Sequence, residues 1–401
     1  MIAPQPFFRA RGTPFSVLHR IRALLALGHR VDLVTYPFGD PISLDGLEII
    51  RSPKPPFVND VKIGPSLGKI LLDIPLYFTA RKQLQKKKYD IIHSHEEAAF
   101  FSVSLARKHA IKHIYDMHSS LPQQLGNFES FDIAPLRMVF QKLERYVLKT
   151  CDGVITICRD LGKTVDQLGV SVPHSMIENT ADDSEIFRPD EVNVVEKFSI
   201  KGKKVVLYTG TFETYQGLDL LLKAFASVSN KRKDVHLLMV GGRSEQIHEM
   251  KRDAANLNIG DSVSFSGTVP SSQIPSYLQA ADVIVSPRSS GTNTPLKIYG
   301  YMKSGIPIVA TDKYTHTQTL DSSTAHLAPA TPAGLAEGIL KVLDDKNYSR
   351  GLAEAASAKA DEEYSDQAYL RRVTDFYARV LSTGDSSTHE HSSNTATNIQ
   401  R

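Results

Sequence analysis

Short apolar runs alternate with amphipathic stretches almost from one end of the chain to the other, and this alternation limits the folds open to it. Ser16–Leu27, for example, has one apolar face at helical spacing and is followed by Gly28, a typical helix stop. Runs of Val, Ile and Leu between such stretches are typical of buried strands. The expected strands are residues 30–35, 89–93, 111–115, 153–157, 204–208, 235–240, 262–265 and 282–285, with another that begins at 306–310. Strands that alternate with helices predict an α/β fold, in which helices cover both faces of parallel sheets.

Length and turn residues divide this pattern into two doubly wound, Rossmann-like domains. The 401 residues exceed one ordinary core and suit two domains of about 150–200 residues each. Periodicity gives way to turn residues and charges between Arg188 and Lys201, as in a linker. We predict domains at 1–188 and 203–365, a linker at 189–202, a last helix at 366–381, and a disordered polar tail at 382–401.

Composition argues against several classes of protein. The net charge of +3 is too small to predict nucleic-acid binding, and no basic stripe is interleaved with aromatic residues. The only cysteines, Cys151 and Cys158, make no disulfide framework, which favours a reducing compartment. No apolar run reaches the length of a membrane span, and no secretory signal pattern opens the sequence. A cytoplasmic protein is therefore expected.

The first residues, Met1–Pro4, have the pattern of the second half of a strand, because strands usually contain about five or six residues. Two interpretations stay open at this point. Either the first strand begins upstream of Met1, or it is a short strand.

One loop in the C-terminal half carries the strongest functional pattern. The apolar run Asp282–Pro287 is followed by small residues and then by a helical stretch that Gly305 ends. Thr294 is expected to cap that helix, with Pro295 as its first residue. The free N–H groups of a helix start form a site for an anion, and Lys297 in the first turn opposes the helix dipole unless an anion binds. The alternative is a surface lysine on an ordinary turn.

A second loop follows the strand that opens the C-terminal half. Gly210 and Gly217 permit close approach of the backbone to a ligand, while Thr211 and Gln216 offer uncharged hydrogen bonds. The carboxyl ends of parallel strands meet at one edge of a sheet. We therefore expect this loop and the one before Lys297 to open on the same cleft, which the two domains face.

Three loops of the N-terminal half are also candidates. They are Arg11-Gly12-Thr13-Pro14, His93-Ser-His-Glu-Glu97 and Asp116-Met-His118-Ser-Ser120. The His–x–His pair suggests a metal, but no third ligand at suitable spacing is evident, so no metal is expected. His118 is either functional or a polar side chain satisfied at a strand end. The sequence has no nucleophile elbow, no Walker-type phosphate loop and no zinc-protease helix.

Together these segments resemble the family-four retaining glycosyltransferases, which have the two-domain GT-B fold and include glycogen synthases and phosphatidylinositol mannosyltransferases. The resemblance covers residues 1 to about 381. It rests on Arg11–Pro14, His118, Ile177–Phe187, Gly210–Gly217, Val240–Gly242, Phe265–Val269 and Thr294–Gly305.

The resemblance implies metal-independent transfer from a nucleotide-sugar, which is a substrate, so no cofactor is implied. The donor would lie on the C-terminal domain, and the acceptor, a glycan, a lipid-linked molecule or a small molecule, on the N-terminal one. Such enzymes are typical of cell-envelope polysaccharide biosynthesis, and their last helix crosses back to the first domain. His118 and Lys297 would be catalytic. The donor-binding residues would be Gly12, Thr13, Gly210, Thr211, Gln216, Gly217, Thr268, Val269, Arg288, Thr292, Asn293, Thr294, Pro295 and Leu296.

Two departures from the family pattern concern charge. The two glutamates of the usual Glu-x7-Glu motif are Thr292 and Gly300 here, and the usual basic pair is absent from the Gly210–Gly217 loop. Arg288 and Lys297 are the nearby cations that could replace that pair. We favour an altered enzyme. The alternatives are a sugar-nucleotide epimerase of the same architecture and a noncatalytic scaffold that binds sugar nucleotides or partners.

A basic run, Arg81–Lys88, follows the apolar stretch Leu71–Phe78. Clustered cations beside apolar side chains bind an anionic leaflet at about 1 kcal/mol per charge. In the family that this chain resembles, such features often mark docking on a membrane. Peripheral contact with the inner face of a membrane is one interpretation, and a solvated helix face is the other.

Overall fold

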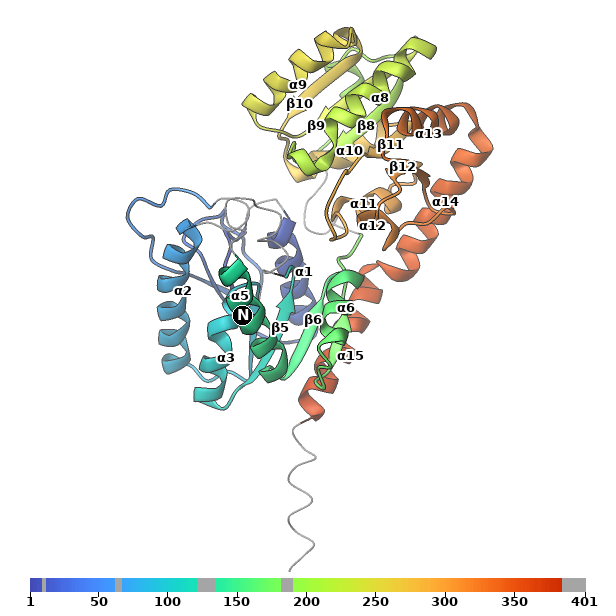
Figure 1. Cartoon of the computed structure of the whole chain (residues 1–401). Helices are drawn as coiled ribbons and strands as arrows, with labels where there is room; N and C mark the ends of the chain where they lie inside the picture. Colours follow the sequence, from blue (N-terminus) through green and yellow to red (C-terminus); the bar gives the residue numbers. More distant parts are fainter. Residues whose placement is uncertain (9–11, 62–66, 121–133, 182–189, 384–401) are drawn as a thin grey trace, which may run out of the picture. The chain divides into compact units, whose positions relative to one another are not determined.

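The computed structural model describes residues 1–8, 12–61, 67–120, 134–181 and 190–383. The chain forms two compact units (Figure 1). Unit 1 contains Met1–Glu178 together with Tyr369–Arg401, and unit 2 contains Asn179–Ala368. The expected tail, Arg11, and most of the resemblance at Ile177–Phe187 lie outside the described residues.

Unit 1 is built on a seven-stranded sheet with the strand order β3-β2-β1-β4-β5-β6-β7. Neighbouring strands are parallel, so their carboxyl ends share one edge. The strands are β1 Ile2–Ala3, β2 Val31–Thr35, β3 Leu47–Arg51, β4 Ile91–His95, β5 Lys112–Met117, β6 Gly153–Thr156 and β7 His174–Met176. The helices are α1 Gly12–Ala26, α2 Leu67–Lys86, α3 Ala98–His109, α5 Ala134–Thr150 and α6 Arg159–Gln167.

The last helix, α15 (Asp366–Ser382), completes unit 1. Phe376 and Val380 of this helix are fully buried, which stabilises the unit by about 1.5–3 kcal/mol for each side chain. They lie so close to Gly153 that a Cβ there would stand 2.6 Å from Val380 and 2.9 Å from Phe376. The Lys112 ammonium donates to the carbonyl of Val380 at 2.6 Å, which satisfies one of the last carbonyls of the helix. Glycine at position 153 is therefore required by the approach of α15.

Unit 2 is built on a six-stranded parallel sheet with the order β10-β9-β8-β11-β12-β13. Alternate side chains of β8 enter two separate apolar clusters, Val206 and Tyr208 in one, Val205 and Leu207 in the other, so both faces of the sheet are covered. The strands are β8 Lys204–Thr209, β9 Val235–Val240, β10 Val263–Gly267, β11 Val283–Ser286, β12 Ile308–Thr311 and β13 His326–Ala328. The α-helices are α7 Val194–Lys197, α8 Leu218–Lys231, α9 Ser244–Asn256, α10 Ile274–Gln279, α11 Lys297–Lys303, α12 Tyr314–Thr317, α13 Pro332–Asp344 and α14 Lys346–Glu363. Short 3-10 turns occur at Thr214–Gln216, Gly260–Ser262 and Ser271–Gln273.

The predicted fold class is confirmed. Both sheets are parallel, and helices alternate with most of their strands along the chain. The first helix begins at Gly12 rather than Ser16, and Gly28 follows it with a φ of 83°. Among the described residues, no helix is long and apolar enough to cross a membrane.

Candidate functional site

In unit 2, glycine backbones pack against each other at the carboxyl ends of β8, β9 and β10. Gly210 follows β8 with a φ of 137°, and its carbonyl lies 2.0 Å from where a Cβ of Gly241 would stand. Gly241 N donates to the carbonyl of Gly267 at 2.9 Å. Thr268, one residue further, donates through Oγ1 to the carbonyl of Gly242 at 3.2 Å. Thr268, one of the expected donor-binding residues, thus lies on the same edge of the sheet as Gly210, while Val269, another of them, packs against one of the apolar clusters.

The two loops of the C-terminal half that were expected to open on one cleft are joined to each other. Gly217, in the left-handed region with a φ of 68°, stands so close to Pro287 that a Cβ would be 2.2 Å from the Pro287 carbonyl oxygen. Ser289 N donates to the carbonyl of Tyr215 at 3.1 Å. Within the first loop, Gln216 donates to Thr211 Oγ1 at 3.4 Å. The structure therefore brings both loops together in unit 2.

Lys297 lies directly beneath Gly210. Its Nζ donates to the carbonyl of Thr209 at 2.9 Å, sits 3.9 Å from the ring centroid of Tyr208, and would be 3.3 Å from a Cβ at position 210. Burial, reinforced by the charge of Arg288, holds the pKa of Lys297 well below its usual value. No carboxylate among the described residues forms an ion pair with Lys297 or Arg288. A cation that burial disfavours, placed under a glycine loop, is suited to receive an anion.

Arg288 lies near Lys297, and its guanidinium is held in place by contacts with Tyr215 and Asn293. The guanidinium stacks 4.9 Å from the ring centroid of Tyr215, and Nη1 donates to the carbonyl of Asn293 at 2.9 Å. Thr315 Oγ1 donates to the same carbonyl at 2.6 Å. Arg288 Nε is buried and has no hydrogen-bond partner among the described residues. Burial lowers the pKa of Arg288 from its ordinary value.

The predicted helix start is wrong. α11 begins at Lys297 with Leu296 before it, and no side chain of the described residues caps it. Thr294 Oγ1, the expected cap, instead lies 3.3 Å from Thr319 Oγ1, while Pro295 supplies a carbonyl to Ile298 N at 2.9 Å. Side chains at α12 and directly after it hold the carbonyls of the preceding residues: Thr315 donates to that of Asn293, and Gln318 to that of Thr292. With seven residues, α11 is too short to supply the expected helix dipole, so the Lys297 side chain is the main cationic feature here.

The structure describes both positions of the missing glutamates. Thr292 is exposed, and its carbonyl accepts a hydrogen bond from the side chain of Gln318. Gly300 lies within α11, and a Cβ there would have no atom within 4 Å. The neighbouring tyrosines do not fill that space, because Tyr299 packs against Tyr364 and the Tyr301 hydroxyl lies 2.7 Å from Thr209 Oγ1. The space beside Gly300 is therefore open.

In unit 1, the side chains of His93, His95 and His118 surround the buried carboxylate of Asp116 at the ends of β4 and β5. Asp116 Oδ2 accepts from Arg20 Nε at 2.9 Å and lies 3.1 Å from His93 Nε2. Asp116 Oδ1 lies 3.3 Å from His118 Nε2. His118 Nε2 is also 2.9 Å from His95 Nδ1. All five side chains are at most 4% exposed.

Charge in this cluster is concentrated on one ion pair. Burial alone would raise the pKa of Asp116, but the charge of Arg20, together with His118 and His93, keeps this pKa well below its usual value. Burial lowers the pKa of His93 to about 4, and the pKa of His95 also falls well below its usual value. Asp116 is therefore ionised and paired with Arg20, while His93 and His95 are neutral near pH 7.

The expectation that the His–x–His pair lacks a third ligand is corrected by the structure. Ligand atoms of His93, His95 and Asp116 lie within 4.8 Å of one another, a grouping that could hold a metal ion. Sequence spacing could not reveal it, because Asp116 comes from the neighbouring strand. Arg20 already neutralises this carboxylate, however, and a metal ion would have to bind next to a buried guanidinium.

A second polar cluster in unit 1 was not predicted. Tyr36 donates to Asp73 Oδ1 at 2.6 Å, and Lys69 lies 3.3 Å from Glu97 Oε1. Burial and the nearby charge of Glu97 raise the pKa of Asp73 to about 7. Thr13, one of the predicted residues, donates to Glu96 Oε1 at 3.3 Å. The sequence did contain a signal for this cluster, namely the consecutive glutamates Glu96 and Glu97 directly after β4.

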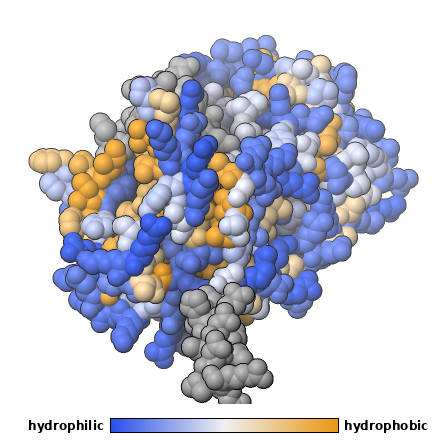
Figure 2. All heavy atoms as spheres, turned by 60° about the horizontal axis from the view of Figure 1, so that its bottom comes forward, coloured by the Kyte–Doolittle hydropathy of each residue, from blue (hydrophilic) through white to orange (hydrophobic). Residues whose placement is uncertain are grey.

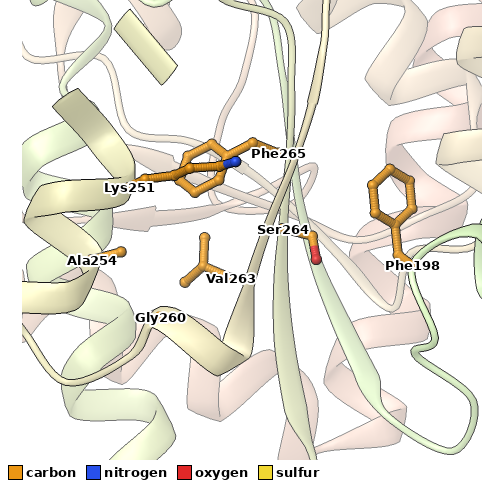
Figure 3. A pocket seen from close by; sticks show the side chains of 7 residues that line it. All are labelled: Phe198, Lys251, Ala254, Gly260, Val263, Ser264 and Phe265. Carbon is orange, nitrogen blue, oxygen red and sulfur yellow. The ribbon is translucent and has the colours of Figure 1, made fainter. Parts of the chain in front are cut away.

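The predicted residues are thus divided between the units: Gly12, Thr13 and His118 belong to unit 1, and the others to unit 2. A separate cavity of about 410 Å³ in unit 2 contains none of them (Figure 3). Residues of α9, of β10 and of the 3-10 turn between them line it, together with one phenylalanine after α7; they are Phe198, Lys251, Ala254, Gly260, Val263, Ser264 and Phe265.

Two family models match consecutive parts of the chain. Residues 10–185 match Glycosyltransferase Family 4, and residues 191–359 match Glycosyl transferases group 1. The mannosylfructose-phosphate synthase of Agrobacterium fabrum is 28% identical over 74% of this chain and 70% of its own length. The alpha-monoglucosyldiacylglycerol synthase of Streptococcus pneumoniae is 29% identical over 71% of this chain and 64% of its own. A phosphatidyl-myo-inositol mannosyltransferase of Mycobacterium tuberculosis is 30% identical over 45% of this chain, which spans about half of that relative (48%).

Solved structures share the fold. The sucrose-phosphate synthase of Thermosynechococcus elongatus superimposes with a TM-score of 0.77 at 20% identity, over 95% of this chain and 99% of that one. Anabaena HepE in complex with UDP gives a TM-score of 0.70 at 15% identity, over 94% and 98%.

Proposed function

The chain belongs to the family-four, or group 1, glycosyltransferases, a retaining family with the GT-B fold, and from this premise we propose a metal-independent transferase that acts on a lipid-linked acceptor. It takes a sugar from a nucleotide-sugar donor, as its family does. Membership of a glycosyltransferase family argues against the epimerase of the same architecture and against the noncatalytic scaffold that the missing glutamates had suggested. The observation that carries the proposal is the Lys297 ammonium beneath Gly210, a cation without an anionic partner among the described residues.

We infer that the donor diphosphate binds to the joined loops of unit 2. An anion above Gly210 would meet Lys297 and the unpartnered Nε of Arg288, and the bound anion would raise the lowered pKa of Lys297. The same charges would oppose the negative charge that develops on the departing diphosphate. Loss of one such preorganised donor costs about 3–4 kcal/mol in transition-state stabilisation. No metal ion is needed in this arrangement, because the protein itself supplies the positive charge.

His118 is proposed to face the donor sugar, with unit 1 as the acceptor-side domain. This assignment follows the family resemblance and the position of His118 directly after β5. His118 and Lys297 then have different tasks, one at the sugar and the other at the leaving group.

An apolar and basic surface on unit 1 supports a lipid-linked acceptor. α3 lies between α2 and α5, since the rings of Tyr77 and Phe101 are 5.6 Å apart and those of Phe100 and Phe140 are 6.1 Å apart. We call the outer faces of these helices the α2–α5 surface; apolar side chains gather on it at the left of Figure 2, over α2. Its apolar residues, each 36–57% exposed, are Ile70, Leu71, Ile74 and Phe78 of α2 and Met138, Val139, Leu143 and Tyr146 of α5.

The charges on this surface are mostly of one sign. Lys82 and Lys86 continue the row of Ile74 and Phe78 at intervals of four residues, and α5 exposes Lys142, Arg145 and Lys149. The one acid of α5, Glu144, is buried and accepts from Ser120. Exposed apolar side chains interleaved with cations favour the surface of an anionic membrane. Two of the relatives are named for lipids, a monoglucosyldiacylglycerol and a phosphatidyl-myo-inositol.

Two measurements separate the parts of this proposal. Calorimetry of nucleoside diphosphates tests the donor site, and co-sedimentation with vesicles of phosphatidylglycerol or phosphatidylcholine tests the surface. We expect binding to the anionic vesicles only, and its loss in Ile74→Ser/Phe78→Ser but not in the control Tyr314→Ser, an exposed aromatic of unit 2. If the protein binds nucleotide but neither vesicle, the lipid-linked acceptor is wrong and a soluble acceptor is favoured.

A further inference from the structure

The buried carboxylate of Asp116 determines where the protons of its histidine neighbours lie. Asp116 Oδ2 receives Arg20 Nε at 2.9 Å, and the pKa of Asp116 is well below its usual value. An ionised carboxylate has no proton to donate, so each nitrogen at hydrogen-bond distance must bring its own. His93 Nε2, at 3.1 Å, therefore carries a hydrogen. Its Nδ1 is left as the acceptor for the Tyr377 hydroxyl of α15.

His118 faces the other oxygen of the same carboxylate. Its Nε2 lies 3.3 Å from Asp116 Oδ1, an ion-pair distance, and 2.9 Å from His95 Nδ1, with which it shares a hydrogen bond. A hydrogen on this Nε2 can be accepted by His95 Nδ1, and the charge of Asp116 Oδ1, which has no hydrogen-bond partner of its own among the described residues, attracts it. The other tautomer would bring the Nε2 lone pair of His118 to 3.3 Å from a carboxylate oxygen, which is repulsive. With Nε2 protonated, Nδ1 is the acceptor atom of the His118 ring.

We propose that Asp116 is a positioning residue for His118: it selects the tautomer protonated at Nε2, so that Nδ1 accepts a hydrogen bond from a hydroxyl of the donor sugar. The inference rests on the proposed function, in which His118 faces that sugar. Asp116 itself touches no substrate. Arg20, His93 and, through His93, Tyr377 keep the carboxylate in place.

This arrangement explains a buried ion pair that stability alone does not require. Buried pairs often contribute little net stability, because removing two charges from water costs about as much as their attraction returns. A fixed anion beside a histidine has a separate consequence, since it sets the tautomer and orientation of the ring. The positive charge of Arg20 keeps the buried Asp116 ionised, and the negative charge of Asp116 in turn attracts the hydrogen on His118 Nε2.

The test combines a spectroscopic signature with kinetics. NMR spectra of protein carrying 15N-labelled histidine are recorded for the wild type and for His118→Gln, and the ring signal that is missing in the variant is assigned to His118. In the wild type this signal should have the 15N chemical shifts of an imidazole protonated at Nε2. In Asp116→Asn the amide can turn its NH2 group toward the ring, and His118 should change to the Nδ1-protonated tautomer. Hydrolysis of UDP-glucose or GDP-mannose, whichever the wild type turns over, should then fall about 100-fold in kcat with little change in KM. This loss is smaller than the ~10⁴-fold loss for the wrong tautomer in a serine protease, because His118 need not move a proton here.

A second variant covers the case in which Asp116→Asn, with Arg20 left unpaired, does not fold. Arg20→Gln/Asp116→Asn removes both charges together and should show the same change of tautomer and the same loss of kcat. The control is Asp152→Asn, since Asp152 of unit 1 accepts from His113 N at 2.7 Å and touches no ring of the cluster. Wild-type His118 protonated at Nδ1, or a folded Asp116 variant with full kcat, would overturn the proposal. Because the tautomer is read without substrate, a failure of the proposed donor site would appear separately, as missing nucleotide binding.

Discussion

Replacing Gly300 by glutamate would restore the second carboxylate of the family motif, and the structure predicts that the new side chain fits. Gly300 lies inside α11, and a Cβ at this position would meet no atom within 4 Å. The backbone needs no glycine here either, because no positive φ occurs at this residue. The substitution should therefore fold normally.

Two magnitudes follow from this geometry. Glycine in a helix interior is less favourable than alanine by about 1 kcal/mol, and glutamate is nearly as good a helix former as alanine. Because α11 has only seven residues, we expect Gly300→Glu to raise the free energy of unfolding by roughly half of that. If the ribose of the donor lies beside position 300, the carboxylate would accept charge-assisted hydrogen bonds of about 1.5–3 kcal/mol. Nucleotide affinity would rise about 10-fold to 150-fold.

The control is Gly351→Glu. Gly351 is also helical, in α14, where a Cβ would likewise meet no atom within 4 Å and no ligand is predicted nearby. Both variants should unfold at higher urea concentration than the wild type, measured by circular dichroism. Titration calorimetry with nucleoside diphosphates should show tighter binding in Gly300→Glu alone. A folded Gly300→Glu that no longer binds any nucleotide would contradict this prediction, because the open space would then be where this chain holds its donor.

Three further predictions concern charge. Lys297→Ala should weaken nucleoside diphosphate binding by about 2 kcal/mol, whereas His118→Ala should lower kcat with little change in that affinity; unchanged calorimetry in the lysine variant would contradict the assignment. Nucleoside diphosphate binding should be the same with and without EDTA, and its disappearance on chelation would reject the metal-free site. Burial lowers the pKa of His93 to about 4, of His113 to about 3 and of His316 to about 4, so these groups bind protons more readily when unfolded, and stability should be full above about pH 6.5 and fall as the pH drops toward 4. Urea midpoints that stay constant from pH 7 to pH 5 would exclude this linkage.

Apart from the edge strand β10, the strands that the sequence revealed are largely buried on both faces. Continuous apolar runs such as Val235–Val240 mark the interior of a parallel sheet. The predicted limits of that strand agree with the structure, whereas the strand predicted at 89–93 is Ile91–His95. Three strands were missed: β3, β7 and β13. Each lies at the edge of its sheet, where half-exposed residues such as those of Leu47–Arg51 leave no continuous apolar run. The first strand appears as the two residues Ile2–Ala3.

The candidate site was predictable where it depends on strand order and not where it depends on long-range packing. Parallel strands bring the loops at Gly210 and Lys297 to one edge, so their association could be expected from the sequence. The helix start at Lys297 could not, because the Asn293 carbonyl before it is held by Thr315, 22 positions away, which is a tertiary contact. The same limit applies to the partners of Asp116, since Arg20, 96 positions away, belongs to no recognisable motif.

The position of α15 matters to anyone who divides the gene. Residues 1–178 are contiguous, yet as a separate product they would leave the backbone of Gly153 bare where Phe376 and Val380 now cover it. The Lys112 ammonium would lose its carbonyl acceptor as well. Expression of residues 1–178 alone therefore omits part of unit 1. A complete unit 1 also needs residues 369–383, either joined through an artificial linker or added as a second polypeptide.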